Sequence, residues 1–310
     1  MITILVPVFN EKESLEAFYK ELSSEVSKLK TDFEILFIDD GSSDGSVDIL
    51  KKFEKDNRIV KIFSFRRNQG KAEALTLGFE KARGDYIITL DADLQDKPSE
   101  ISKILGLLQL GNDVVCGWRK NRQDSKSKVI SSGFFNFLIS FFSKLKLHDY
   151  NCGLKGYSRV AAKSLKLYGG MHRFIPLLCH QQGFRVAEVP ILHGERKFGK
   201  SKYGFSKLWK DLPDIFTMLF LKAYGRRPLH FFGLVGGITI FSGIIILGYL
   251  SYIHFQGETI GNRPLLFLGM LLVIGGFQVF FTGLLADLII NSQSSKSMES
   301  DKSLIRYESK

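Results

Sequence analysis

Two long runs without charged side chains limit what the C-terminal part of this 310-residue chain can fold into. Residues 229–253 and 264–286 contain no Asp, Glu, Lys or Arg. As helices, both runs are long enough to cross roughly 30 Å of hydrocarbon. The sequence therefore predicts a two-helix transmembrane hairpin over residues 229–290. Two buried helices of a soluble core are the alternative interpretation.

The charges beside these runs predict their orientation. The loop between the runs carries one basic residue, Arg263, whereas five bases lie close outside them, at Lys222, Arg226, Arg227, Lys296 and Lys302. The positive-inside rule places the flanks that are richer in Lys and Arg in the cytoplasm. We therefore expect an integral protein of the plasma (inner) membrane with both termini cytoplasmic. The polar residues 291–310 are expected to form a flexible tail.

Residues 1–228 alternate between strand-like and helical patterns. Apolar, β-branched segments at residues 2–8, 33–38, 59–65 and 85–90 are each followed by a segment of helical periodicity. This alternation predicts an α/β domain with a mostly parallel sheet and helices on its faces. Neither GxGxxG nor GxxxxGK[ST] follows the first strand, so the sequence supports neither a dinucleotide fold nor a P-loop there.

Carboxylates follow several of the predicted strands. Asp39 and Asp40 follow the second strand, and Asp91 and Asp93 follow the fourth in the stretch LDADLQD. Ligands of parallel α/β sheets bind at the carboxyl ends of the strands, so these side chains are expected on one rim. Two close carboxylates repel, which indicates that a metal or a cationic substrate binds at Asp91 and Asp93. An acidic surface turn is the alternative for this motif taken alone.

Charge and cysteine content restrict the partners and the compartment. A net charge of +11 and a pI near 9.4 indicate an anionic partner, which can be nucleic acid, an anionic membrane surface or a phosphorylated ligand. The bases cluster beside apolar membrane segments, which disfavours nucleic acid. The three cysteines, Cys116, Cys152 and Cys179, show no metal-ligand spacing and are expected to be reduced structural thiols of a cytosolic domain.

Two more apolar segments, at residues 129–147 and 205–222, are flanked by bases. We expect both to be helices in the membrane interface, where bases suit anionic headgroups. A core helix is the alternative for the first. Between them, ERKFGKSKYG at 195–204 interleaves four bases with glycines and is expected to be a loop that folds over a phosphate group. A solvated basic loop is the alternative.

Five motifs occur in the order VPVFNE, IDDGSSDGS, LDADLQD, NCGLKGY and ERKFGKSKY, before the two apolar runs. In this order they resemble the polyprenyl-phosphate glycosyltransferases of glycosyltransferase family 2, which are similar to dolichol-phosphate mannose synthase. The bacterial undecaprenyl-phosphate glucosyltransferases look closest. The resemblance reaches to about residue 286 and implies a GT-A catalytic domain, Rossmann-like with a mostly parallel sheet, at 1–228. At the end of the second span relatives often carry a Glu and an Arg, whereas this chain reads LLADLIINSQ.

The resemblance also implies roles for individual residues. The implied donor contacts are Pro7, Phe9, Glu11, Ile38, Asp39, Asp40, Asp91, Ala92, Asp93, Arg119, Arg196 and Lys202. The implied metal ligands are Asp91, Asp93 and Gln95. The implied contacts of the acceptor phosphate are Arg119, Lys126, Lys128 and Ser132. Asp93, Arg119 and Arg196 are the implied catalytic residues.

The reaction that the resemblance implies is a metal-dependent, inverting transfer of a hexose from a nucleotide-sugar to a polyprenyl phosphate on the cytoplasmic face. UDP-glucose is the preferred donor, and Mg²⁺ or Mn²⁺ is the expected cofactor. The second pKa of a phosphate monoester is about 6, so the acceptor is largely ionised at neutral pH and hardly needs a general base. The expected partners are the donor, the lipid acceptor and the membrane, without nucleic acid; a homo-oligomer is compatible with the sequence.

Other functions stay open at this point. A processive polysaccharide synthase usually carries QxxRW, and the nearest match here, QGFRV at 182–186, lacks the Trp. A glycolipid synthase, or a transferase that acts on protein, would share the fold. A non-catalytic membrane scaffold that binds lipid phosphate is a different class. The two aspartates, Gln95 and the basic loop argue against it, because a scaffold has no need to hold a metal.

Overall fold

The computed structural model describes residues 1–29, 31–120, 145–194, 227–261 and 264–303, with residues 133, 139, 140, 217, 220 and 223–225 in addition. The chain divides into two compact units, Met1–Asp214 and Ile215–Lys310. The first contains the predicted α/β domain and the second contains both apolar helices. The predicted boundary near residue 228 and the observed one at Asp214 both follow the last described strand.

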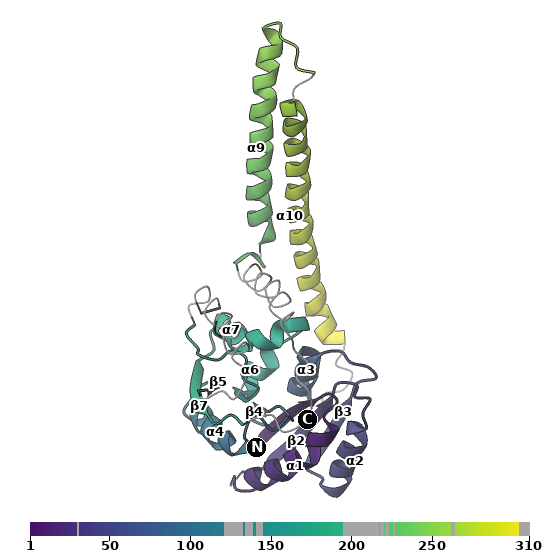
Figure 1. The fold of residues 1–310 in the computed structure, drawn as a ribbon, viewed down its shortest axis with the longest axis vertical. Coiled ribbons are helices and arrows are strands. Elements are labelled where there is room, and N and C mark those ends of the chain that lie inside the picture. The colour runs from purple at the N-terminus through teal and green to yellow at the C-terminus, as the bar shows by residue number, and fades with distance from the viewer. Residues whose placement is uncertain are drawn as a thin grey trace. The chain divides into compact units, whose positions relative to one another are not determined.

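The first unit is built on a seven-stranded sheet with the order β3-β2-β1-β4-β6-β5-β7 (Figure 1). β1 to β4 form parallel pairs, as do β5 and β7, whereas β6 is antiparallel to β4 and β5. The predicted mostly parallel sheet is thereby confirmed. Its strands are β1 (Ile2–Val8), β2 (Phe33–Asp39), β3 (Val60–Ser64), β4 (Tyr86–Thr89), β5 (Val114–Arg119), β6 (Lys155–Ser158) and β7 (Val186–Ile191).

Helices connect the parallel strands, because a parallel pair needs a crossover of a dozen or more residues. The α-helices of this unit are α1 (Lys12–Val26), α2 (Ser46–Asp56), α3 (Lys71–Lys81), α4 (Ile101–Gln109), α6 (Arg159–Ser164) and α7 (Ile175–Gln181). Two 3₁₀ helices, η1 (Pro98–Glu100) and η2 (Gly169–Phe174), precede α4 and α7.

Side-chain alternation along β1 places helices on both faces of the sheet. Ile4 and Val6 belong to the core cluster that also contains α1 and α4 side chains. Leu5, which points to the opposite face, packs against α3 at Gly78, where a Cβ atom would collide with the leucine side chain. With both faces covered, β1 reads as a nearly continuous apolar run instead of an alternating one.

The strand order reverses direction at the centre of the sheet. From β1 the chain proceeds outward through β2 and β3, then returns to place β4 on the other side of β1. In open α/β sheets ligands bind in the crevice outside the carboxyl ends of the strands at such a switch point. The residues after β1 and β4 are therefore those most favourably placed to contact a ligand.

Two local features differ from the sequence-based expectations. The family resemblance implies that the segment Gly117–Arg119 follows a fifth strand, whereas the segment lies within β5. β6 carries no sequence signal that predicts a strand, because its four residues, KGYS, show neither alternation nor β-branched enrichment. Most of the predicted interfacial helices, 129–147 and 205–222, and the basic loop at 195–204 lie outside the described residues.

The second unit contains α9 (Pro228–Phe255) and α10 (Pro264–Ser303), which lie side by side and antiparallel (Figure 1). Pro228–Phe255 and Pro264–Ile290 each contain an 18-residue stretch with a mean hydropathy of 2.2, and both helices are long enough to cross a membrane. Most of their large apolar side chains are exposed, for example Phe241 and Leu271. This exposure fits contact with lipid and argues against the alternative of soluble core helices.

Glycines allow the two apolar helices to approach each other closely. A Cβ atom at Gly236 would lie 2.8 Å from the carbonyl oxygen of Gly276, and one at Gly243 would lie 2.8 Å from that of Gly269. Small residues at such positions bring helix backbones close together. α10 continues beyond the apolar run to Ser303, so the first part of the predicted tail is helical.

Candidate active site

The carboxyl ends of β1, β2 and β4 surround an open cavity of about 340 Å³, which we call the outer cavity. This volume lies within the range of roughly 300–1,000 Å³ that ligand pockets occupy. The lining contains most of the donor-binding residues implied by the sequence. The lining residues are Pro7, Val8, Phe9, Glu11, Asp40, Asn68, Gly70, Lys71, Ala74, Asp91, Ala92 and Asp93.

The two carboxylates after β2 have different surroundings. Asp40 lines the outer cavity and accepts hydrogen bonds from the backbone N–H groups of Gln69 at 2.7 Å and Gly70 at 3.0 Å. Burial nevertheless raises its pKa above the usual aspartate value. Asp39 is fully buried and accepts from the Ser64 hydroxyl at 2.7 Å. Asp39 therefore orders the loop around Asp40 and does not itself line the cavity.

The aspartates after β4 are held by a tight turn and by a lysine. Leu94 adopts a left-handed backbone with φ 63°, and the backbone N–H of Gln95 donates to the Asp93 carboxylate at 3.2 Å. The ammonium of Lys71, the first residue of α3, donates to both Asp91 oxygens at 2.6 and 2.8 Å. A left-handed non-glycine residue costs of order 1–3 kcal/mol and is often found at functional sites.

Asp91 and Asp96, which lie near this turn, differ in pKa because their surroundings differ. Burial raises the pKa of Asp91, but the Lys71 ammonium outweighs burial and brings the pKa below the usual value. Burial, followed by repulsion from Asp91, raises the pKa of Asp96 to about 7. Asp91 is therefore ionised at neutral pH, while Asp96 is close to its midpoint.

A second cavity of about 150 Å³, the inner cavity, shares Pro7, Lys71 and Asp91 with the outer one. It extends from Asp91 toward β6 and η2. Most charged groups on its wall are basic. The residues that line it are Pro7, Lys71, Leu75, Thr89, Asp91, Arg119, Asn151, Cys152, Gly153, Lys155, Tyr157, His172, Arg173 and Ile175.

His172 is the neutral member of this basic wall. Burial, and then the positive charge of Lys71, lower its pKa to about 3. Its Nδ1 atom is buried and has no hydrogen-bond partner among the described residues. The imidazole therefore offers an unused polar atom beside the inner cavity.

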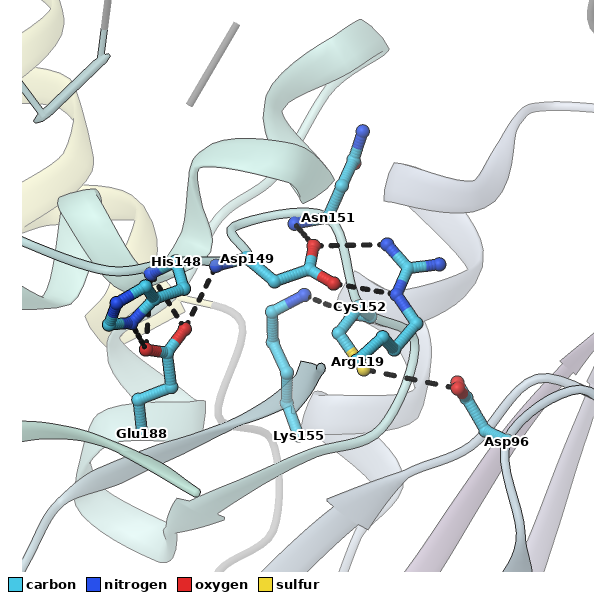
Figure 2. Close-up of polar contacts among 8 residues, drawn as sticks. All are labelled: Asp96, Arg119, His148, Asp149, Asn151, Cys152, Lys155 and Glu188. Carbon is cyan, nitrogen blue, oxygen red and sulfur yellow. Dashed lines mark hydrogen bonds and ion pairs between the residues drawn. The ribbon is translucent and has the colours of Figure 1, made fainter. Parts of the chain in front are cut away.

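Arg119 forms a buried ion pair that the sequence did not suggest. Its Nε donates to Asp149 Oδ2 at 2.6 Å and its Nη2 to Oδ1 at 3.0 Å (Figure 2). The two side chains are 12% and 3% exposed. Burial acts to lower the pKa of Arg119, but Asp149 raises it overall, so the guanidinium stays charged. A bidentate pair of this kind fixes the guanidinium plane beside the inner cavity.

The residues present fit a divalent cation whose coordination is completed by substrate. Within the described ranges, no group of three His, Cys, Asp or Glu side chains could hold a metal alone. Mg²⁺ is commonly bound through one or two carboxylates together with substrate phosphates, and carboxylates suit Mn²⁺ equally. Asp91 and Asp93 supply two such carboxylates on one cavity wall. In this structure the Lys71 ammonium provides the positive charge beside Asp91.

The structure brings together some of the implied residues and not others. Ile38 is buried in β2 and lines neither cavity, and Gln95 also lines neither. Five implied residues lie outside the described part of the chain: Lys126, Lys128, Ser132, Arg196 and Lys202. Sequence reasoning missed five residues of the inner cavity and its support, which are Lys71, Asp149, Lys155, His172 and Arg173.

For two of the missed residues a signal existed. Lys71 opens a helix directly after a strand of the same sheet, and Lys155 lies inside the NCGLKGY motif. The other three lie in segments without a recognised pattern. Only the tertiary structure shows that η2 packs near α3.

Comparisons with known proteins show the family of this chain. The family described as Glycosyl transferase family 2 matches residues 3–166. A dodecaprenyl-phosphate galacturonate synthase from Rhizobium johnstonii is 35% identical over 295 residues, which cover 93% of this chain and 87% of the relative. An undecaprenyl-phosphate 4-deoxy-4-formamido-L-arabinose transferase from Serratia proteamaculans is 33% identical over 291 residues, which cover 93% of this chain and 88% of that relative.

Solved structures also resemble this chain. Glucosyl-3-phosphoglycerate synthase from Mycobacterium tuberculosis, crystallised with Mn²⁺ and UDP-glucose, superposes with a TM-score of 0.56. The match covers 72% of this chain and 78% of that chain at 18% identity. At this identity the likeness concerns the fold, and it confirms the predicted GT-A architecture.

Proposed function

Because this chain belongs to glycosyltransferase family 2, we propose that it transfers a sugar from a nucleoside diphosphate donor to a polyprenyl phosphate. Both curated relatives carry a polyprenyl phosphate in their names, and the matches cover 93% of this chain. The observation that carries the proposal is the pair Asp91 and Asp93 at the switch point of the sheet, in a chain that also has two candidate membrane spans.

The outer cavity would hold the nucleoside diphosphate. Asp40, which accepts hydrogen bonds from backbone N–H groups after β3, would contact the nucleoside, and Phe9 would offer an apolar surface. Asp91 and Asp93 would hold Mg²⁺ or Mn²⁺, which neutralises the charge of the leaving diphosphate when bound. The Lys71 ammonium lies on the wall of the outer cavity, where it pairs with Asp91. It can therefore leave Asp91 and bind a phosphate oxygen of the donor.

The acceptor phosphate would attack the anomeric carbon in one displacement with inversion. An ionised phosphate needs no proton removed, so catalysis consists of positioning and charge stabilisation. Two anionic groups must approach each other, and the basic side chains implied by the sequence, Arg119, Arg196 and Lys202, would offset their repulsion. Lys126, Lys128 and Ser132 remain the proposed contacts of the acceptor phosphate.

The proposed location is the inner membrane, with the α/β unit on the cytoplasmic side. The two apolar helices support the membrane location, and the distribution of Lys and Arg supports the orientation. Thr259→Cys, in the loop between the helices, should react with a membrane-impermeant maleimide in intact cells. Ser300→Cys should react only after lysis, and the reverse pattern would overturn the orientation.

The decisive experiment is transfer of radiolabelled sugar to undecaprenyl phosphate by detergent-purified protein. A panel of UDP- and GDP-sugars, with and without Mn²⁺, should give a metal-dependent lipid product; the panel includes UDP-glucose, the donor preferred from the sequence, and UDP-galacturonate. Asp93→Ala should lower the rate by roughly 10²-fold or more, because the leaving group loses its charge stabilisation.

The matched control for this experiment is Asp56→Ala, an exposed aspartate at the end of α2, which should leave transfer unchanged. Near-normal transfer by Asp93→Ala in metal-replete buffer would overturn the assigned role. No product from any donor, in protein that still gains thermal stability from UDP with Mn²⁺, would overturn the choice of acceptor.

A further inference from the structure

The cations that line the inner cavity differ in their carboxylate partners within the described part of the chain. Lys71 pairs with Asp91, and Arg119 pairs with Asp149. Lys155, on the same cavity wall, is 5% exposed, and no carboxylate lies within ion-pair distance of it in the described ranges. A buried charge is costly unless it is paired, so such a lysine indicates a ligand that brings negative charge.

The strand register explains where the Lys155 ammonium lies. Lys155 opens β6 and pairs with Thr89 of the antiparallel neighbour β4, so both side chains project from the same face of the sheet. Thr89 precedes the aspartate motif by two residues, and both Thr89 and Lys155 line the inner cavity. The ammonium donates to the carbonyl oxygen of Cys152, which leaves two of its three hydrogens for other acceptors (Figure 2).

Two neighbouring groups complete a polar, anion-binding wall. Arg173 lines the same cavity and is 9% exposed, so it adds a second buried positive charge. His172 contributes the buried Nδ1 atom without a described partner. The cavity therefore combines positive charge with hydrogen-bonding capacity in a small volume.

The position of the cavity identifies which part of a substrate enters it. It shares Asp91 with the outer cavity, where the diphosphate would be held, and it extends away from the nucleoside contacts. In the donor, the sugar is joined to the phosphate that lies farther from the nucleoside. The sugar would therefore lie in the inner cavity, beyond the diphosphate. A polyprenyl chain would not fit in about 150 Å³.

We propose that the inner cavity binds the donor sugar and that Lys155 pairs with a carboxylate on that sugar, which makes the preferred donor a nucleoside diphosphate uronic acid. This inference rests on the proposed function and goes beyond it by assigning the residue that selects the sugar. A neutral hexose leaves the buried ammonium unpaired, which is the source of the selectivity.

Donor binding provides the test, because it requires no acceptor. Titration calorimetry with Mn²⁺ compares UDP-galacturonate and UDP-glucuronate with UDP-galactose and UDP-glucose. The wild-type protein should bind the better uronate at least about 10-fold more tightly than its neutral hexose. Lys155→Met should weaken uronate binding by roughly 10- to 100-fold and change neutral-donor binding by less than about 3-fold. Lys155→Arg, which keeps the charge, should recover part of the preference.

The matched control is Lys166→Met, the same change at an exposed position near the end of α6, which should alter neither Kd. Equal wild-type affinity for uronates and hexoses would overturn the inference without any variant. Equal weakening of both donors by Lys155→Met, with a lower Tm, would make the lysine structural. If Lys155→Met leaves donor binding unchanged but raises the KM for undecaprenyl phosphate, the Lys155 ammonium binds the acceptor phosphate.

The failure of this inference and the failure of the proposed function are distinguishable. If wild-type protein transfers neutral hexoses to the lipid as well as it transfers uronates, the inference falls and the function stands. If uronates bind selectively but no lipid product forms from any donor, the function falls and the assignment of Lys155 stands.

Discussion

The ammonium of Lys71 lies 2.6 and 2.8 Å from the two carboxylate oxygens of Asp91. This ion pair joins the first turn of α3 to the residue motif that follows β4, and it lies on the wall shared by both cavities. It keeps Asp91 ionised despite burial. The pair therefore maintains the acidic motif in the form that a divalent cation requires.

Lys71→Met should reverse the pH dependence that Asp91 contributes to stability. In the wild-type protein the pKa of Asp91 is below its unfolded value of about 3.9. The stabilisation from Asp91 is therefore present above about pH 3.9 and is lost as the pH falls through the native pKa of this group. Without Lys71, burial should place the native pKa above the unfolded value. The variant should then be destabilised by about 1–3 kcal/mol at pH 7, and regain stability as pH falls through that raised pKa toward 4.

Thermal unfolding in metal-free buffer between pH 4 and 8 measures this difference. Each side chain of the pair is 33% exposed, so solvent screening keeps the effect moderate. Lys51→Met, at an exposed position of α2, is the control and should follow the wild-type curve. A Lys71→Met curve parallel to the wild type would contradict the role of the pair.

Gly153→Ala should disturb the acidic motif although it replaces no predicted metal ligand. A Cβ atom at Gly153 would lie 2.6 Å from Asp91 Oδ2 and 2.7 Å from Asp96 Oδ2, so one or both carboxylates must move. Changes beside metal ligands typically cost 10- to 100-fold in affinity, and we expect roughly that loss of Mn²⁺ affinity, measured by titration in the presence of UDP. Gly106→Ala in α4, where nothing lies within 4 Å of the added methyl, should bind Mn²⁺ normally.

Removal of one partner from the Arg119–Asp149 pair should destabilise the α/β unit. The remaining charge would be buried without a counter-ion, at a cost of about 3–5 kcal/mol. Arg119→Met and Asp149→Leu should each lower the Tm, and the double variant should lose less than the sum of the two. Additive losses would mean that the two side chains act independently in solution.

The three cysteines should resist alkylation in the native protein. All are free and buried. Burial raises the pKa of Cys116 and of Cys179 to about 12, and it raises the pKa of Cys152 well above the usual value. Little thiolate therefore exists at pH 8, and iodoacetamide should label the protein only after denaturation, as judged by intact mass. Labelling of folded protein would show that one of these thiols is reached by solvent.

The sequence by itself determined the elements and the membrane segments. Periodicity and composition locate β1 to β4, the helices between them and both apolar spans, because strand and helix patterns are local properties of the chain. The rule that ligands bind at the carboxyl ends of parallel strands predicts Asp39, Asp40, Asp91 and Asp93 on one rim. Asp40, Asp91 and Asp93 do line one cavity, whereas Asp39 is buried and lines neither.

The tertiary structure alone decided what surrounds those aspartates. β6 has no local signal, yet its antiparallel insertion between β4 and β5 brings Lys155 beside the motif. Lys71 and Arg119 acquire their carboxylate partners from segments 20 and 30 residues away in the chain. Charge pairing and burial depend on distances between segments that are remote in sequence, so no local pattern records which cation is neutralised and which is left to bind a ligand.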